Sequence, residues 1–208
     1  TDHVHVLTSG LADSFGRADL WLVGSRNVNA VAVRSVDGGR SSATALQVGP
    51  RSGHAQDFAR FHFVFVHAGR LYVQAQDFQG GMFPRSQVWN GAAWGDGPDL
   101  RPIRSVGSRP AAFLGQIVYL GERSLMAFDG RQAREARRAT ARVVDLVVAG
   151  GALHVLDGQD VVATADLARW TPVATAPAKA TSIGILDGFL YVGTEDAELF
   201  RYCRRLGP

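Results

Sequence analysis

The sequence has 208 residues, of which 46% are hydrophobic and 20% are charged. This balance is typical of a soluble globular protein that is long enough to bury most of its apolar surface in one domain. No apolar run approaches the roughly 18 residues of a membrane-spanning helix, and a formal net charge of +3 is too small to indicate nucleic-acid binding. Cys203 is the only cysteine, which excludes an intrachain disulfide and a multi-cysteine zinc site. The sequence begins at Thr1, so a secreted or periplasmic protein with its signal removed stays an open alternative, and the compartment is undecided.

Short segments rich in β-branched residues open the chain. We expect strands at residues 3–7, 19–23, 29–34 and 43–46. The segment 35–42 separates the last two and contains Asp37 followed by two glycines. An aspartate side chain can cap its own turn while glycines take positive φ, so this segment predicts a tight hairpin between a third and a fourth strand.

One sequence pattern recurs along the chain: a turn glycine, a variable residue and then an apolar, aromatic-rich run. Its clearest copies begin at Gly69, Gly115, Gly151 and Gly188, and a looser copy lies at residues 19–23. The four glycines are 46, 36 and 37 residues apart. Propeller repeats are roughly 40 to 50 residues long, so the spacing is close to that of a propeller.

Each repeat supplies about four expected strands. After the first repeat they lie at 61–66, 71–74, 87–89 and near Trp94; at 110–114, 117–120 and 125–128 with an arginine-rich outer edge at 131–142; at 143–148, 153–156, 161–164 and 170–173; and at 181–186, 189–192 and 198–202. A single four-stranded sheet of this kind exposes two apolar faces. Stacking against neighbouring sheets around an axis buries both.

Three short motifs resemble those of kelch and sialidase-type propellers. Residues 35–42 are similar to an Asp-box turn without its aromatic residue, residues 165–170 are similar to one that keeps it as Trp170, and residues 88–94 resemble the end of a kelch repeat, where a tryptophan closes the blade against its neighbour. The resemblance implies an all-β fold, a β-propeller of five blades with about four antiparallel strands each. We expect one domain, 1–208, with blades at 1–50, 51–102, 103–142, 143–178 and 179–208. A fragment of a six- or seven-bladed propeller is the alternative, and an insertion at residues 11–17 makes the first repeat the least regular.

The last repeat is one strand short, which leaves two arrangements for residues 3–7. They either add an outer strand to the last blade or form the innermost strand of the first blade. We favour the second arrangement, because it gives each of the first four blades about four strands and leaves three in the last.

Propeller ligands usually bind where loops converge at one face, so we expect ligand-binding residues in the loops between second and third strands and between blades. The predicted set is Arg26, Asn27, Asp57, Arg60, Asp77, Phe78, Phe83, Arg85, Arg123, Asp157 and Glu195. The simpler alternative is that these loops are polar because they are solvated. The loop 77–85 is longer than its equivalents and holds Phe78, Met82 and Phe83, which either cover a ligand or partner, or fold back over blade 2.

The sequence predicts no metal, cofactor or catalytic residue. His3 and His5 alternate on one strand face, but no third ligand accompanies them, and the segment 157–160 is too short for a calcium loop. No serine lies in a nucleophile-elbow pattern. The arginine-rich segment 131–142 is best explained as a solvated outer edge, with binding of phosphate or acidic protein as the alternative.

These observations favour a non-catalytic binding module that presents loops at one propeller face to a glycan or protein partner. One alternative is a glycosidase-class enzyme or a fragment of one, although the arginine, tyrosine and glutamate residues that such an enzyme needs lie outside recognisable motifs. Another alternative is a structural or assembly subunit. We expect neither nucleic-acid binding nor membrane insertion, and the sequence leaves the oligomeric state open.

Overall fold

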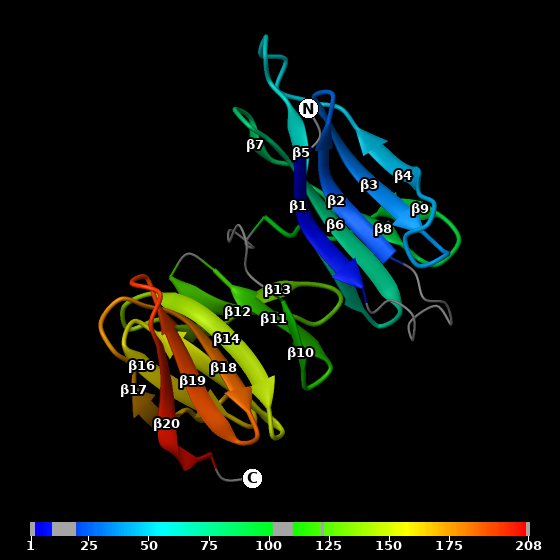
Figure 1. Cartoon of the computed structure of the whole chain (residues 1–208). Helices are drawn as coiled ribbons and strands as arrows, with labels where there is room; N and C mark the ends of the chain where they lie inside the picture. The colour runs from blue at the N-terminus through cyan, green and yellow to red at the C-terminus, as the bar shows by residue number, and fades with distance from the viewer. Residues whose placement is uncertain (1–2, 10–19, 102–109, 122, 207–208) are drawn as a thin grey trace. The chain divides into compact units, whose positions relative to one another are not determined.

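The computed structural model describes residues 3–9, 20–101, 110–121 and 123–206, and these residues form twenty β-strands and no helix. The side chains of the first strand and of residues 62 and 63 are not among those described. No helix in the described part of the chain could therefore cross a membrane. The chain divides into two compact units, which are described separately below (Figure 1).

Unit 1 contains two antiparallel sheets, here called blade 1 and blade 2. Blade 1 has the strand order β1 (His3–Ser9), β2 (Leu20–Arg26), β3 (Asn29–Ser35) and β4 (Ala43–Val48). Blade 2 has the order β5 (Ala59–His67), β6 (Arg70–Asp77), β8 (Gln87–Trp89) and β9 (Trp94–Asp96), and the short strand β7 (Gly81–Met82) also pairs with β6.

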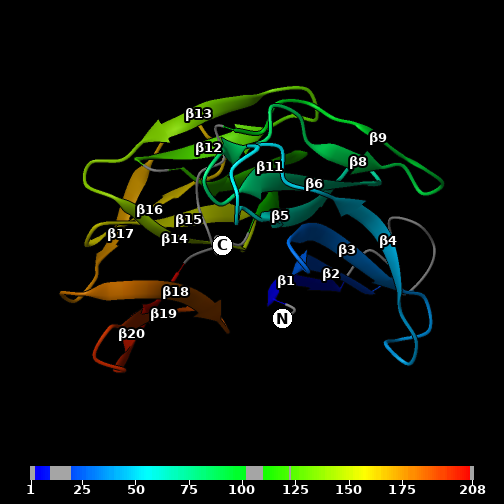
Figure 2. The same ribbon diagram turned by 90° about the horizontal axis from the view of Figure 1, so that it is seen from above.

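Unit 2 contains three antiparallel sheets, here called blades 3, 4 and 5 (Figure 2). Blade 3 consists of β10 (Ala111–Phe113), β11 (Gln116–Leu120), β12 (Ser124–Phe128) and β13 (Ala133–Arg138). Blade 4 consists of β14 (Val143–Ala149), β15 (Ala152–Asp157), β16 (Asp160–Thr164) and β17 (Thr171–Thr175). Blade 5 consists of β18 (Ala180–Leu186), β19 (Phe189–Thr194) and β20 (Leu199–Arg205).

The N-terminal strand belongs to blade 1, which confirms the favoured arrangement. β1 pairs with β2 from Ser9↔Leu20 to His3↔Ser25, and blade 5 has three strands among the described residues. The predicted insertion at residues 11–17 lies outside the described residues.

The recurring glycine pattern marks a two-residue turn between the first and second strands of blades 2 to 5. Gly69, Gly115, Gly151 and Gly188 have φ of 71°, 71°, 74° and 76°, and the residue before each also has positive φ. Two consecutive positive φ values define the type I′ turn, whose twist matches that of the flanking strands. The glycines are therefore placed by backbone geometry, as the sequence indicated.

The aromatic residues of this pattern are not buried equally. Tyr72 and Tyr119 are in the core. Tyr191 is only half-buried, because the neighbouring residues Leu190 and Val192 occupy the side of β19 that packs on blade 4.

Tryptophans fill the core between blades 1 and 2. Trp21 of β2 is fully buried, and its ring centroid lies 6.0 Å from that of Trp89 and 5.8 Å from that of Trp94. Trp89 and Trp94 thus pack blade 2 against blade 1. In unit 2, one apolar cluster joins blades 3 and 4, and a second joins blades 4 and 5.

The two aspartate turns join third to fourth strands in blades 1 and 4. Asp37 accepts hydrogen bonds from the backbone N–H of Ser41 (2.9 Å) and from its hydroxyl (2.6 Å). Asp166 accepts from the backbone N–H groups of Ala168 (2.8 Å) and Arg169 (2.7 Å). In both turns the carboxylate caps its own backbone, so the role is structural.

Candidate binding surfaces

Most of the predicted site residues lie at or beside the connections between second and third strands or between blades, whereas Arg60 lies within β5. The structure assigns them different surroundings. Those of blades 1 and 2 belong to unit 1, and those of blades 3 to 5 belong to unit 2.

In unit 2, backbone hydrogen bonds tie each of these loops to a connection between blades. The loops of blades 4 and 5 bond to the connection that precedes the blade, and that of blade 3 bonds to the connection that follows it. The Gly158 N–H donates to the Arg142 carbonyl (2.8 Å), the Glu195 N–H donates to the Lys179 carbonyl (3.0 Å), and the Arg123 carbonyl accepts from Ala139 (3.0 Å). The side chains of Arg123 and Glu195 are exposed.

Asp157 is buried, with 2% of its surface exposed. Its carboxylate accepts hydrogen bonds from the N–H groups of Thr140 (2.8 Å) and Ala141 (3.1 Å), and the Arg137 guanidinium lies 3.5 Å away. This carboxylate holds the connection between blades 3 and 4 and is not available to a ligand in the solvent.

In blade 1, Arg26 and Asn27 lie at the exposed hairpin between β2 and β3. Asn27 and Val28 both have positive φ, at 46° and 67°. The Val28 carbonyl accepts from the Ala59 N–H (2.8 Å), so this hairpin also ties blade 1 to blade 2.

Five of the six predicted residues of blade 2 lie in two segments, 51–58 and 77–85, which we call the loop cluster. Asp57 and Asp77 form its buried frame, at 5% and 3% exposure. Asp77 accepts from the backbone N–H of Arg51 at 3.1 Å. Asp57 accepts from the Ser52 hydroxyl and from the N–H of Gln79 (3.1 Å), and these hydrogen bonds, the one from Ser52 above all, lower the pKa of its carboxyl group. Both aspartates therefore fix one segment against the other.

The two phenylalanines of the loop cluster differ. Phe83 is buried, with 6% exposed, whereas Phe78 is 59% exposed and stacks on Phe58 with ring centroids 5.0 Å apart. Phe83 thus folds back onto blade 2, and Phe78 presents one face to the surroundings.

A hollow of about 460 Å³ opens beside Phe83. Its lining is Val48, Arg51, Ala75, Phe83, Pro84, Arg85, Gln87 and Asp96. The Arg51 guanidinium lies 5.1 Å from the centre of the Phe83 ring, a cation–π distance. Asp96 accepts from the side chain of Gln87 at 3.1 Å. Neither Arg51 nor Arg85 forms an ion pair with a carboxylate of the described residues, so two arginines without carboxylate partners line a partly aromatic hollow.

Arg60 stands apart from this hollow at the start of β5. It is half-buried, and its Nε finds no hydrogen-bond partner within the described part of the chain. The remaining predicted residues of blade 2 form the loop cluster without it.

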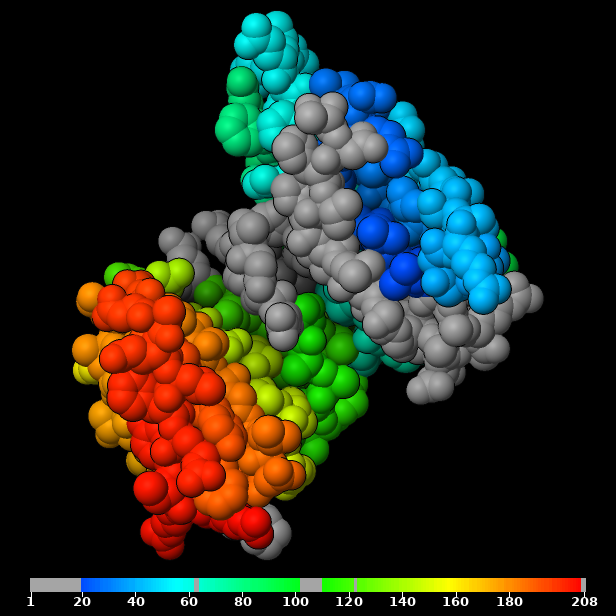
Figure 3. All heavy atoms as spheres, in the orientation of Figure 1, coloured from blue at the N-terminus to red at the C-terminus, as the bar shows by residue number. Residues whose placement is uncertain are grey.

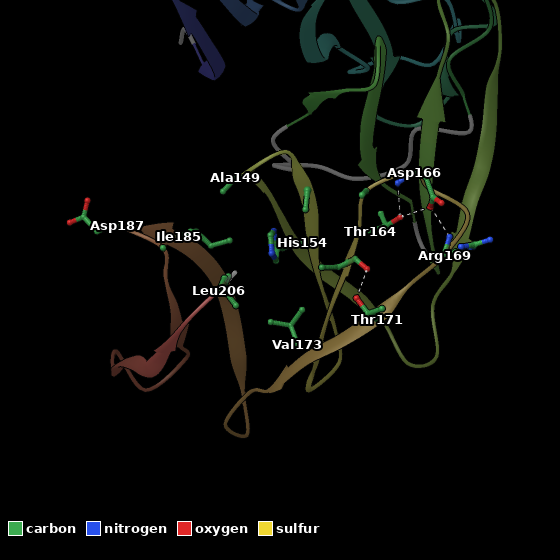
Figure 4. A pocket seen from close by; sticks show the side chains of 15 residues that line it. Ala149, His154, Thr164, Asp166, Arg169, Thr171, Val173, Ile185, Asp187 and Leu206 are labelled. Carbon is green, nitrogen blue, oxygen red and sulfur yellow. Dashed lines mark hydrogen bonds between the residues drawn. The ribbon is translucent and has the colours of Figure 1, made fainter. Parts of the chain in front are cut away.

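A larger cavity, of about 680 Å³, lies between blades 4 and 5, beside the turns that join their first and second strands (Figure 4). Its apolar wall includes Ala149, Ala163, Val173, Ile185 and Leu206, and its polar groups are His154, Thr164, Asp166, Arg169, Thr171 and Asp187. We call it the blade 4–5 cavity. None of its residues was among the predicted site residues.

His154 projects into the middle of this cavity from β15 (Figure 4). It is 6% exposed, its Nδ1 has no hydrogen-bond partner among the described residues, and burial lowers the pKa of its imidazole. One signal in the sequence pointed to it: His154 occupies the position of the recurring pattern where Tyr72 and Tyr191 stand in other repeats.

Within the described residues, no group of three or more histidine, cysteine, aspartate or glutamate side chains could hold a metal ion. The side chains of His3 and His5 are outside this description.

No family model matches the chain, and no curated protein matches it. Several solved structures are similar to it. BamB from Moraxella catarrhalis aligns with 91% of the chain at 11% identity and a TM-score of 0.55, and a protein from Lactobacillus plantarum aligns with 98% at 15% identity and 0.56. The C-terminal WD40 domain of Sif2 aligns with 99% at 12% identity and 0.52. The chain spans 56%, 71% and 59% of the lengths of these three chains.

These similarities, together with successive antiparallel sheets of three or four strands in each unit, define the fold as that of β-propeller proteins. At this identity they establish the fold alone.

Proposed function

We propose that the protein is a non-catalytic binding module and that its loop cluster binds a carboxylate-bearing glycan. The hollow beside Phe83 carries the proposal, because Arg51 and Arg85 supply two guanidinium groups that lack carboxylate partners among the described residues. Arginine binds carboxylates through paired hydrogen bonds, and aromatic faces stack on sugar rings.

The direct test is binding of uronic-acid oligosaccharides and of their neutral counterparts on a glycan array and by calorimetry. We expect the acidic oligosaccharides to bind and Arg85→Ala to weaken them roughly tenfold, which corresponds to about 1.4 kcal/mol. Arg40→Ala is the matched control, because Arg40 is an exposed arginine of the turn between β3 and β4. Equal binding of neutral and acidic sugars, or an equal loss in the control, would refute the proposal.

An acidic protein segment is a second candidate ligand, favoured by the exposed ring of Phe78. Aromatic residues supply much of the binding energy at protein interfaces. A polyglutamate peptide that binds more tightly than the oligosaccharides, and loses affinity in Phe78→Ala, would assign the loop cluster to a protein partner.

The glycosidase alternative receives no support from the loop cluster. Such enzymes use a pair of free carboxyl groups roughly 5 to 9.5 Å apart. The carboxylates of Asp57 and Asp77 are both engaged by backbone N–H groups that hold the two segments together.

A further inference from the structure

β20, the third strand of blade 5, differs from the third strands of blades 3 and 4. In blades 3 and 4, a fourth strand pairs with β12 and β16, and four of the five residues in each of these third strands are buried. β20 pairs with β19, and no other described strand pairs with it. This end of the chain, drawn in red, lies on the surface seen in Figure 3. Six of the seven residues of β20 are exposed, including Leu199 at 71% and Phe200 at 39%.

A hollow of about 330 Å³ lies beside β20, between blades 4 and 5. Its lining is Val173, Ala174, Leu190, Tyr202, Arg204, Arg205 and Leu206. The Tyr202 hydroxyl donates to the Thr175 carbonyl, which holds β20 beside the end of β17. An added strand at this edge would direct alternate side chains to one face of the sheet, and apolar ones would enter the hollow.

The charge of this edge is uniformly positive. β20 carries Arg201, Arg204 and Arg205, and none of them forms an ion pair with a carboxylate of the described residues. Arg201 and Arg205 instead lie 5.0 and 5.1 Å from the centre of the Phe189 ring. A segment with carboxylates would complement these three guanidinium groups.

We propose that the edge of β20 is a docking site for an extended acidic and apolar segment of a partner protein, which adds to blade 5 as its fourth strand. Main-chain hydrogen bonds to β20 supply affinity, apolar side chains fill the hollow, and carboxylates meet the arginines. This site lies in unit 2 and is independent of the function proposed for the loop cluster.

Arginines also occur on bare edges that only need protection from aggregation. β13, the outer strand of blade 3, is of that kind, with arginines and a glutamate on a strand that already completes its sheet. β20 adds exposed Leu199 and Phe200 and an adjacent apolar hollow, which a protective edge does not need.

The test uses the full chain and two synthetic seven-residue peptides, one alternating valine with glutamate and one alternating valine with lysine. We expect the glutamate peptide, at roughly 1 mM, the weak end of specific binding, to slow amide hydrogen exchange in residues 199–205 at least tenfold. The lysine peptide should leave exchange unchanged. Absence of protection by the glutamate peptide overturns the proposal.

Arg204→Glu should weaken the glutamate peptide tenfold or more and allow the lysine peptide to bind. Arg138→Glu is the matched control on β13, where Arg138 is likewise exposed, and it should change affinity less than twofold. Ala174→Trp, which fills the hollow, is a second variant in case Arg204→Glu does not fold, and it should also abolish binding. An equal loss of peptide affinity in Arg138→Glu would overturn the proposal. It would also be overturned if protection of β20 rose with protein concentration and sedimentation showed a dimer.

Discussion

A hydroxyl residue followed two positions later by an aspartate recurs at the end of two third strands. Ser35 ends β3 and Thr164 ends β16, and Asp37 and Asp166 lie in the turns that follow. In each pair the hydroxyl donates to the carboxylate and accepts from a backbone N–H of the turn. Because every partner lies within four residues, this device could be predicted from the sequence.

Asp37 makes the turn of blade 1 sensitive to acid. Hydrogen bonds from Ser41 and Ser35 lower the pKa of its carboxyl group from 3.8 to about 2. The ionised form therefore favours the folded chain, and this contribution is complete above about pH 4 and is lost as the pH falls towards 2. Thermal unfolding measured between pH 5 and pH 2 should show that Asp37→Asn lowers the melting temperature most near pH 5. Asp160→Asn, at an exposed turn of blade 4, is the control. If the difference in melting temperature between Asp37→Asn and the unaltered protein does not shrink as the pH falls, the prediction is contradicted.

His154 introduces a second pH dependence, which has the same sign as that of Asp37 but lies at higher pH. Burial lowers the pKa of its imidazole in the folded chain below the ordinary value of 6.5. The unfolded chain then takes up a proton before the folded chain does, so stability is complete above pH 6.5 and declines as the pH falls below it. We expect His154→Phe to flatten the dependence of the unfolding free energy on pH between about 7.5 and 5.5. Chemical denaturation at several pH values measures this, with the exposed His54→Phe as control. A slope that persists in His154→Phe would refute the assignment.

At the scale of the strand, the inner strands of blades 4 and 5 are joined by one carboxylate. Asp145 of β14 accepts from its neighbour Leu146 (2.9 Å) and from the N–H of Ile183 in β18 (2.8 Å). It lies beside an irregularity in the pairing of β14, and β18 has one at the corresponding place. The carboxylate satisfies a backbone donor that the sheet ladder leaves unpaired.

Removal of this link should destabilise unit 2. Asp145→Ala leaves the Ile183 N–H without its acceptor, which costs about 1–3 kcal/mol. Asp196→Ala breaks an exposed ion pair with Lys179 (3.2 Å) in the same unit and should cost less than about 1 kcal/mol. Urea unfolding measures the free energy of unfolding of both variants. Equal losses would show that the hydrogen bond from Ile183 to Asp145 stabilises the fold no more than the exposed ion pair does.

Strand positions were predictable because glycine turns and β-branched runs act locally. The roles of the loop aspartates could not be predicted, because Asp77 accepts a hydrogen bond from a residue 26 positions away and Asp157 accepts hydrogen bonds from residues 16 and 17 positions away. In the sequence these aspartates look like any other polar loop residue. The short strand β7, inside the loop 77–85, was also missed, because two residues carry no periodicity. The blade 4–5 cavity depends on the packing of two sheets, and only His154 gave a local sign of it.

At the scale of the whole chain, each unit has its own apolar core. Unit 1 is built around Trp21, Trp89 and Trp94, whereas the fourth tryptophan, Trp170, packs in unit 2. In repeat proteins stability is approximately a sum of local terms and nearest-neighbour interfaces, so a core defect acts first on its own unit. Tryptophan fluorescence therefore reports mainly on unit 1, and circular dichroism reports on the strands of both.

This difference allows the two cores to be tested separately. Leu190 is fully buried between blades 4 and 5, so Leu190→Ala should cost about 2–5 kcal/mol in unit 2. We expect the circular dichroism transition in urea to begin at lower concentration while the fluorescence midpoint stays in place. Leu71→Ala, equally buried in unit 1, is the matched variant and should move the fluorescence midpoint. If each variant instead shifts both signals together, the chain unfolds as one cooperative body and the two cores are energetically inseparable.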